Sequence, residues 1–294
     1  MKTLLLGLLS AVAVCVGAAG STAATFPTCL GEPATKIGTP GDDTITATDD
    51  DDVIVGLGGN DTIAGGGGFD LICGGDGNDS ILQTSGGLFG AAIVSGDAGD
   101  DTIQAGRDTL VGADYEESPA AVNVDLTAGT ATGDGTDSLA GVDVAYGSAF
   151  DDVLNGNAKM NILVGYGGND TISGLGGPDL IGAEAGDDVV DGGKGRDQMY
   201  YGDSPSGVHV RLAKGTATGE GNDHLKSIED VTGSKRADVI VGTSGPNAFT
   251  GGSGNDHLFG LGGRDRLIGE RGKDRADGGP GKDVCRAEKI VHCP

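Results

Sequence analysis

Aspartate recurs at every ninth position between Gly56 and Leu82. This stretch reads GLGGNDTIA, GGGGFDLIC and GGDGNDSIL, and its carboxylates are Asp61, Asp70 and Asp79. Calcium, a hard cation, takes six to eight oxygen ligands at about 2.3–2.6 Å, from carboxylates and backbone carbonyls. A regular series of carboxylates among glycine carbonyls therefore predicts the binding of a hard divalent cation.

The residues around each aspartate predict the element that positions it. Glycine takes the fourth position of every unit, and Ile63, Ile72 and Ile81 take the eighth. Glycine tolerates positive φ, so the half rich in Gly, Asn and Asp predicts a turn. The remaining residues predict a very short strand with one aliphatic side chain pointing inward. Two units would complete one coil, which stacks turns from alternate units on the same side.

The nine-residue register extends over most of the chain. Five units run from Gly38 to Leu82, one follows a break at residues 83–95, and six units run over each of 147–200 and 233–286. Asparagine replaces the sixth-position aspartate at Asn161 and Asn247. We expect the remaining sixth-position residues to be metal ligands: Asp43, Asp52, Asp61, Asp70, Asp79, Asp101, Asp152, Asp170, Asp179, Asp188, Asp197, Asp238, Asp256, Asp265, Asp274 and Asp283.

Two segments of 32 residues, 115–146 and 201–232, interrupt the repeats and match each other at an offset of 86. Val122, Val124 and Leu126 alternate with polar residues, which predicts strand, turn and strand. Whether these inserts widen the repeat structure or form hairpin linkers stays open. The predicted organisation is a signal peptide (1–24), an N-terminal cap (25–37), block 1 (38–114), insert 1 (115–146), block 2 (147–200), insert 2 (201–232), block 3 (233–286) and a C-terminal disulfide cap (287–294).

The consensus G-G-x-G-x-D-x-U-x, where U is a large aliphatic residue, resembles the RTX (hemolysin-type calcium-binding repeat) family. The resemblance implies an all-β fold, a right-handed parallel β-roll or β-helix solenoid, with calcium between the turns of alternate units. Pairing such units gives up to about eleven calcium ions. The sites that use Asn161 or Asn247 should be weaker, because the amide lacks the charge. Ion binding would then contribute much of the folding free energy.

Composition supports a solenoid. The chain of 294 residues has 59 Gly, no Trp and only 11 Phe and Tyr, so a core of large side chains is not available. A solenoid needs only one aliphatic residue per short strand. A disordered acidic linker is the alternative, but it gives no reason for Asp and Ile to keep a fixed register.

The N-terminal segment predicts export. Residues 1–24 contain Lys2, an apolar run and small residues before the expected cleavage site, as in a secretory signal peptide. We therefore expect a secreted, extracellular protein in which disulfides persist. The four mature cysteines allow three connectivities. We favour Cys29–Cys73 and Cys285–Cys293, because each bond closes a local loop near one end of the repeats.

Positive charge gathers at the C-terminal end. Residues 192–294 hold 15 of the 19 Lys and Arg against 14 acidic residues, whereas the whole chain has a formal net charge of −25. Arg264, Lys273 and Lys282 directly precede predicted ligands. These cations either reduce repulsion between carboxylates, weaken calcium binding in this block, or dock the block on a polyanionic cell surface.

Signatures of catalysis are missing from the sequence. The four His include no H-E-x-x-H motif, and no G-x-S-x-G occurs. Repeats and inserts leave no room for a catalytic domain. We therefore expect a non-enzymatic, secreted calcium-binding module with a structural role, which is a monomer without a membrane span or a nucleic-acid partner.

Three other functions stay open: binding of cell-wall glycan, binding of ice, and service as the accessory chain of a secreted enzyme. An ice-binding solenoid needs a flat ladder of outward Thr. The seventh and ninth positions of successive units run Thr44/Thr46, Val53/Val55, Thr62/Ala64 and Leu71/Cys73, which predicts no such ladder.

Overall fold

The computed structural model describes residues 27–84 and 90–293, which form two compact units. Unit 1 contains the described residues up to Ala113 together with 135–142, and unit 2 contains 114–134 and the residues from Asp143 onward. The predicted signal peptide lies outside the described residues. Among the residues that the structure describes, no helix has the length and hydrophobicity needed to cross a bilayer.

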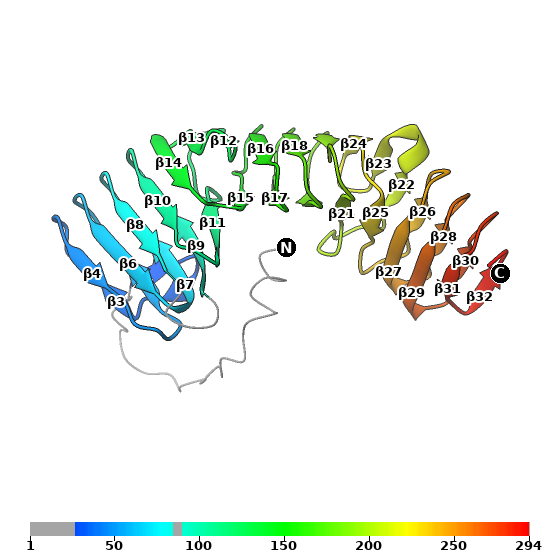
Figure 1. The fold of residues 1–294 in the computed structure, drawn as a ribbon, viewed down its shortest axis with the longest axis horizontal. Helices are drawn as coiled ribbons and strands as arrows, with labels where there is room; N and C mark the ends of the chain where they lie inside the picture. Colours follow the sequence, from blue (N-terminus) through cyan, green and yellow to red (C-terminus); the bar gives the residue numbers. More distant parts are fainter. Residues whose placement is uncertain (1–26, 85–89, 294) are drawn as a thin grey trace. The chain divides into compact units, whose positions relative to one another are not determined.

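Short strands alternate between two parallel sheets in each unit, which we call sheet I and sheet II (Figure 1). In unit 1, sheet I contains β4 (Thr44–Thr46), β6 (Thr62–Gly66), β8 (Ser80–Gln83), β10 (Thr102–Ala105) and β14 (Thr136–Ala140). Sheet II of unit 1 contains β3 (Lys36–Ile37), β5 (Val53–Val55), β7 (Gly68–Cys73), β9 (Gly90–Ser95) and β11 (Thr109–Asp114).

Unit 2 repeats this arrangement. Its sheet I contains β12 (Asn123–Asp125), β13 (Thr130–Thr132), β16 (Val153–Asn157), β18 (Thr171–Leu175), β20 (Val189–Asp191), β22 (His209–Arg211), β23 (Thr216–Thr218), β24 (Asn222–Lys226), β26 (Val239–Val241), β28 (His257–Phe259), β30 (Arg275–Asp277) and β32 (Lys289–Val291). Its sheet II contains β15 (Val144–Tyr146), β17 (Ile162–Val164), β19 (Leu180–Gly182), β21 (Gln198–Tyr200), β25 (Asp230–Thr232), β27 (Ala248–Gly254), β29 (Arg266–Gly272) and β31 (Val284–Arg286).

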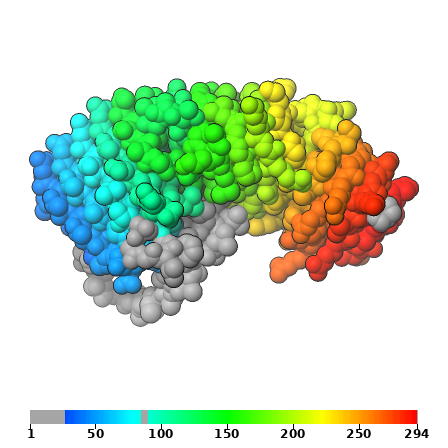
Figure 2. All heavy atoms as spheres, viewed as in Figure 1, coloured from blue at the N-terminus to red at the C-terminus, as the bar shows by residue number. Residues whose placement is uncertain are grey.

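The strand register confirms a parallel β-solenoid with 18 residues in each regular coil. Thr44 pairs with Thr62, and Val153 pairs with Thr171. Eighth-position side chains fill the interior, and Ile63, Ile72 and Ile172 are each at most 1% exposed. Within each unit the sequence colours follow one another in order in Figure 2, because each coil packs on the next coil along the chain.

Insert 2 is part of sheet I, which answers the question that the sequence left open. β22 pairs in parallel with β26, β24 pairs in parallel with β20, and β23 runs antiparallel to both β22 and β24. A single 3-10 turn, η1 (Leu212–Lys214), connects β22 to β23 and ends at Gly215, which has φ of 65°. The insert therefore adds three strands to the sheet, one more than the predicted strand, turn and strand.

The break predicted at residues 83–95 also contains a strand. β9 pairs with β7, and this pairing sets Leu71 opposite Ile93. The same pairing sets the eighth-position Ile72 opposite Val94, and Val94 is fully buried, so it fills the place of an eighth-position aliphatic residue. The coil between Asp79 and Asp101 is therefore enlarged to 22 residues, and the stacking of coils continues through it.

Both predicted disulfides are present. Cys29–Cys73 joins β1 (Thr28–Cys29) to β7 with a Cα–Cα distance of 5.6 Å, and β1 pairs antiparallel with β2 (Glu32–Pro33). Cys285–Cys293 joins β31 to the residues after β32 with a Cα–Cα distance of 6.2 Å. Each bond lies at one end of the repeats.

The prediction that outward Thr form no ladder is wrong for sheet I of unit 1. Successive units belong to different sheets, so the relevant comparison is between alternate units. The strand pairings place exposed hydroxyl residues in one column, which contains Thr44, Thr62, Ser80, Thr102 and Ser138. The neighbouring column has a single hydroxyl, because it contains Thr46, Ala64, Leu82, Gln104 and Ala140.

Candidate metal centre

The sixth-position residues lie in rows, each of which follows one edge of the solenoid. In unit 1, one row contains Asp43, Asp61, Asp79 and Asp101, and another contains Asp52 and Asp70. In unit 2, the rows are Asp152–Asp170–Asp188, Asn161–Asp179–Asp197, Asp238–Asp256–Asp274 and Asn247–Asp265–Asp283. The structure thus brings all sixteen predicted aspartates into rows.

One carboxylate oxygen of each following aspartate has a backbone partner. Oδ1 of Asp170 accepts the backbone N–H of Asp152 at 2.8 Å, and Oδ1 of Asp188 accepts that of Asp170 at 2.8 Å. The same bond recurs along all the rows. Oδ1 therefore fixes each carboxylate against the preceding coil.

The second carboxylate oxygen has no hydrogen-bond partner at most of these residues. This holds, among the described residues, for the buried Oδ2 atoms of Asp61, Asp79, Asp101, Asp170, Asp179, Asp188, Asp197, Asp256, Asp265, Asp274 and Asp283. A buried polar atom without a hydrogen-bond partner destabilises the fold by about 1–3 kcal/mol, and the cost is larger for a charged group such as a carboxylate. A cation held against these oxygens would remove that cost.

Glycine at the first position keeps the space around Oδ2 open. A Cβ atom on Gly165 would collide with Asp170 Oδ2, and it would also approach the carbonyl oxygen of Ala183 in the next coil. Gly56 has the same relation to Asp61 Oδ2 and the carbonyl of Gly74. Carboxylate and carbonyl oxygens from two coils thus lie around a point that only glycine leaves free.

This donor set fits calcium. In the described part of the chain, no three His, Cys, Asp or Glu side chains gather closely enough to hold an ion by themselves. A site in a row would therefore combine one or two carboxylates with several backbone carbonyls, and such all-oxygen sets suit calcium. Zinc and other softer metals favour imidazole or thiolate ligands, which these rows lack.

Burial raises the pKa of the interior aspartates, and neighbouring carboxylates in the same row raise it further. The pKa rises to about 7 at Asp70 and Asp170 and to about 8 at Asp101, where desolvation is the main cause. Hydrogen bonds from the backbone oppose this shift without cancelling it. A calcium ion would favour the ionised form of these carboxyl groups.

The first residue of each row is held differently. Ser148 donates its backbone N–H to Asp152 Oδ2 and its hydroxyl to Asp152 Oδ1, and Ser234 does the same for Asp238. Thr48 donates both its backbone N–H and its hydroxyl to Asp52 Oδ2. At Asp52 burial favours a higher pKa, but the hydrogen bonds from Thr48 and Thr35 outweigh it and lower the pKa. Hydroxyl residues thus cap the row starts.

Asn161 and Asn247 also begin rows. Asn161 Nδ2 donates to the carbonyl of Asp143 at 3.1 Å, and Asn247 Nδ2 donates to the carbonyl of Glu229 at 2.6 Å. An aspartate could not donate either bond. The amide therefore has a structural function at a row start, beyond the loss of charge that the sequence indicates.

Insert residues that lie outside the nine-residue register continue or end the rows. Asp137 Oδ1 accepts the N–H of Asp101 at 3.1 Å, and Asp223 Oδ1 accepts that of Asp188 at 3.5 Å. The spacing G-x-G-x-D-x-L occurs at 133–139 and again at 219–225, so each insert contains a degenerate repeat unit. This spacing is the feature of the sequence that indicates Asp137 and Asp223 as members of the rows.

Other side chains close rows without a further repeat. Glu229 Oε2 accepts the N–H of Asp197 at 3.0 Å, and Glu288 Oε2 accepts that of Asp274 at 2.8 Å. Gln83 donates its side-chain amide to Asp70 Oδ2 at 2.7 Å. Each contact satisfies the last coil of its row.

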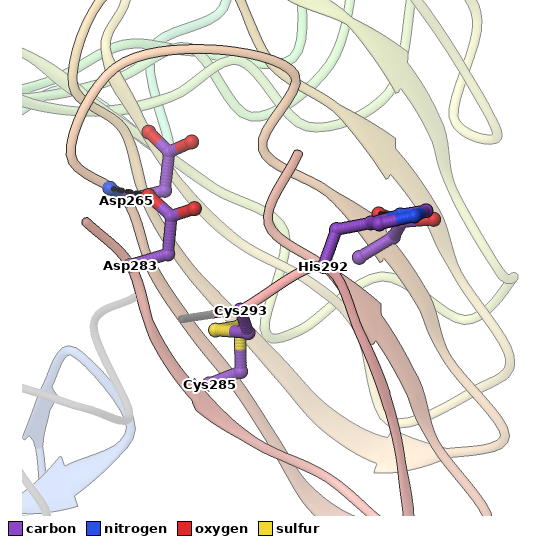
Figure 3. Close-up of a disulfide and its surroundings, with 6 residues drawn as sticks. Asp265, Asp283, Cys285, His292 and Cys293 are labelled. Atoms are coloured by element: carbon purple, nitrogen blue, oxygen red, sulfur yellow. Dashed lines mark hydrogen bonds and ion pairs between the residues drawn. A yellow bond between two sulfur atoms is a disulfide. The ribbon is translucent and has the colours of Figure 1, made fainter. Parts of the chain in front are cut away.

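The C-terminal disulfide lies beside the last row (Figure 3). Asp265 donates its backbone N–H to Asp283 Oδ1 at 2.9 Å, and Cys285 follows Asp283 by two residues. A Cβ atom on Gly278 would meet both Asp283 Oδ2 and the carbonyl of His292. The segment closed by Cys285–Cys293 thus supplies the carbonyl that a further coil would otherwise provide.

Comparison with known proteins identifies the repeats. The family model of the RTX calcium-binding nonapeptide repeat matches residues 37–72, 46–81, 87–114, 132–158, 146–181, 164–199, 232–267 and 259–288. These segments cover more than half of the chain, and one of them begins at the degenerate unit of insert 1. No curated protein matched the chain. The chain belongs to the RTX calcium-binding nonapeptide repeat family.

Proposed function

We propose that this protein is a secreted structural module that folds on binding calcium and has no catalytic activity. The sixteen sixth-position aspartates hold up to about eleven ions, together with carbonyls of the first-position glycines. The proposal includes the domain organisation predicted from the sequence: a signal peptide, two caps, three blocks and two inserts. The role of the module is mechanical, either in the extracellular space or at the cell surface.

The observation that carries the proposal is the set of buried Oδ2 atoms without hydrogen-bond partners. Rows of such atoms are costly without a cation, because like charges repel and each oxygen is desolvated. Gly-rich turns add a large loss of conformational entropy on folding. Calcium offsets both costs, so folding and ion binding are coupled.

Circular dichroism of the mature chain during a calcium titration tests the proposal. We expect little β signal in EGTA and a cooperative gain of β signal as calcium rises to millimolar concentration. Equal β signal with EGTA and with calcium would contradict the coupling between folding and calcium binding. Secretion has a separate test, because deletion of residues 1–24 should keep the protein inside the producing cell.

A further inference from the structure

Basic side chains cover the outer face of sheet I near the C-terminal end of unit 2. The central residues of its strands, Val210, Ile240 and Leu258, are fully buried, so the residues on either side of them face outward. We call the outward cationic and imidazole residues of β22, β28, β30 and β32 the basic face. It contains His209, Arg211, His257, Arg275 and Lys289.

The strand pairings arrange this face in straight columns. One column runs through His209, Val239, His257, Arg275 and Lys289, and consecutive members are direct strand partners. Neighbouring strands in a sheet lie about 4.8 Å apart. The last three members therefore form an uninterrupted line of nitrogen-bearing groups with a regular spacing.

A planar group lies beside this line. The Arg275 guanidinium carbon is 5.6 Å from the ring centroid of Phe259, and His257 meets the same ring edge-on at 6.4 Å. Asp277 is the one acidic residue that faces outward from β22, β26, β28, β30 and β32. It is already paired, at 3.4 Å from Arg275 and 3.1 Å from His292.

Acidic and basic residues of this region occupy different places. Half of the 14 acids in residues 192–294 lie buried in rows, whereas none of the 15 Lys and Arg is buried. The buried acids are Asp197, Asp223, Asp238, Asp256, Asp265, Asp274 and Asp283. Calcium in the rows would neutralise these carboxylates, so the surface that remains is basic.

We propose that the basic face binds a linear acidic polysaccharide whose uronate carboxylates lie along the column from His257 to Lys289. Arginine suits carboxylates because its planar fork donates two parallel hydrogen bonds. Each sugar advances a (1→4)-linked uronate chain by roughly one strand spacing and turns it over, so alternate carboxylates face the sheet about two strands apart, as His257 and Lys289 are. The inference rests on the proposed function, because the solenoid that arranges the face folds only when calcium fills the rows.

Other polyanions fit this face less well. Phosphates on one strand of a DNA duplex rise by about 3.4 Å along the helix axis and wind around it, so they do not follow a straight column with a step of about 4.8 Å. Insertion into a lipid surface needs protruding apolar side chains. The outward apolar residues of β26, β28 and β32, which are Val239, Val241, Phe259 and Val291, are only partly exposed.

Binding of a short labelled oligogalacturonate to the calcium-loaded mature chain tests the inference. The face variant is Arg275→Gln with Lys289→Gln, and the control variant is Arg266→Gln with Arg286→Gln. All four residues stand at outward strand positions, but Arg266 and Arg286 belong to sheet II. We expect the face variant to lose about tenfold or more in affinity and the control variant less than about twofold.

Two further comparisons make the result decisive. Neutral dextran should not bind, and high salt should weaken oligogalacturonate binding because salt screens exposed charges. Equal affinity losses in both variants, or no loss in the face variant, would overturn the inference. Tighter binding of single-stranded DNA or of phosphatidylserine vesicles would also overturn it. Calcium-dependent circular dichroism should persist in both variants, which separates this failure from a failure of the proposed function.

Discussion

The two oxygens of an interior row aspartate have different environments. At Asp170, Oδ1 accepts a backbone N–H, whereas Oδ2 is buried without a hydrogen-bond partner. An asparagine could keep the first interaction, but it would lose the charge. The two functions of the carboxylate can therefore be separated by one substitution.

Asp170→Asn should lower the number of bound calcium ions by at least one per chain. It should also lower the melting temperature in calcium by several degrees, since about 1 kcal/mol shifts it by about 2–4 °C in a domain of this size. Metal analysis and thermal unfolding measure both. Asp151→Asn is the matched control, because exposed Asp151 accepts the N–H of Asn169 through Oδ1 and stands outside the row. Equal effects of the two substitutions would contradict a ligand role for Asp170.

Gly165→Ala should weaken calcium binding without removing any ligand. The added Cβ collides with Asp170 Oδ2 and with the next coil. Gly167→Ala is the control in the same unit, because its Cβ would meet only the carbonyl of Ala185 at 3.8 Å. Calcium titrations of both variants compare them. If Gly167→Ala weakens binding as much as Gly165→Ala, the loss comes from backbone stiffness and not from the space around Oδ2.

Without calcium, the fold should be more stable in mild acid than above neutral pH. The pKa values of Asp70, Asp101 and Asp170 rise to about 7, 8 and 7, well above the value of about 3.9 for an unfolded chain. A raised pKa means that the folded state holds its protons more tightly. Its contribution to stability is present at low pH and is lost as the pH rises through about 7 to 8.

Circular dichroism in EGTA at about pH 5 and at about pH 8 checks this pH dependence. We expect more β signal at the lower pH. The calcium-loaded protein should show the opposite trend in affinity, because protons compete with calcium for the same carboxylates. A calcium-free chain with the same β signal at both pH values would show that these carboxylates do not limit folding.

At the scale of elements, the two disulfides close loops of very different length. Cys29 and Cys73 are separated by 44 residues, and Cys285 and Cys293 by 8. The entropy of loop closure grows with length, so the N-terminal bond restricts the unfolded chain more strongly.

Replacing both cysteines of the N-terminal bond by serine should cost about 4 kcal/mol, and the same change at the C-terminal bond about 2.5 kcal/mol. Urea unfolding of the two double variants in saturating calcium measures the difference. The loss should be larger at the N-terminal bond than at the C-terminal bond. A larger loss at the C-terminal bond would mean that it stabilises the folded state directly, through the row that ends at Asp283.

The regular elements follow from sequence alone, whereas the row ends do not. A strict period of nine predicted the strands, the inward Ile63 and Ile72, and the alignment of Asp43, Asp61 and Asp79. Glu288 has no such signal, because it joins its row through a longer side chain outside the register. The roles of Ser148 and Gln83 likewise depend on contacts between coils.

The inserts show a different kind of limit. Their alternating residues predicted strands correctly, yet the Asp223 unit was not predicted, because it starts at Thr218, outside the nine-residue register of the blocks. Its pairing partner is β20, which lies one block earlier in the sequence. Pairing of that kind depends on how the chain returns to the sheet, and local pattern carries no information about it.

At the scale of the whole molecule, magnesium should not replace calcium. Magnesium demands near-ideal octahedral geometry at about 2.0–2.1 Å and retains several waters. Carbonyls fixed by parallel strands cannot contract around so small an ion. We expect no gain of β signal when magnesium replaces calcium at equal concentration in the dichroism titration. Full recovery of the β signal with magnesium would contradict the proposed ligand set.

The capped row starts and closed row ends have a consequence for cooperativity. Ser148, Asn161, Gln83, Glu229 and Glu288 divide the carboxylates into short series, each complete in itself. Losing one ion disturbs the neighbours in its own series, and the disturbance stops at the next cap. These side chains therefore confine the effect of losing one ion, whether by chelation or by mutation, to the row that held it.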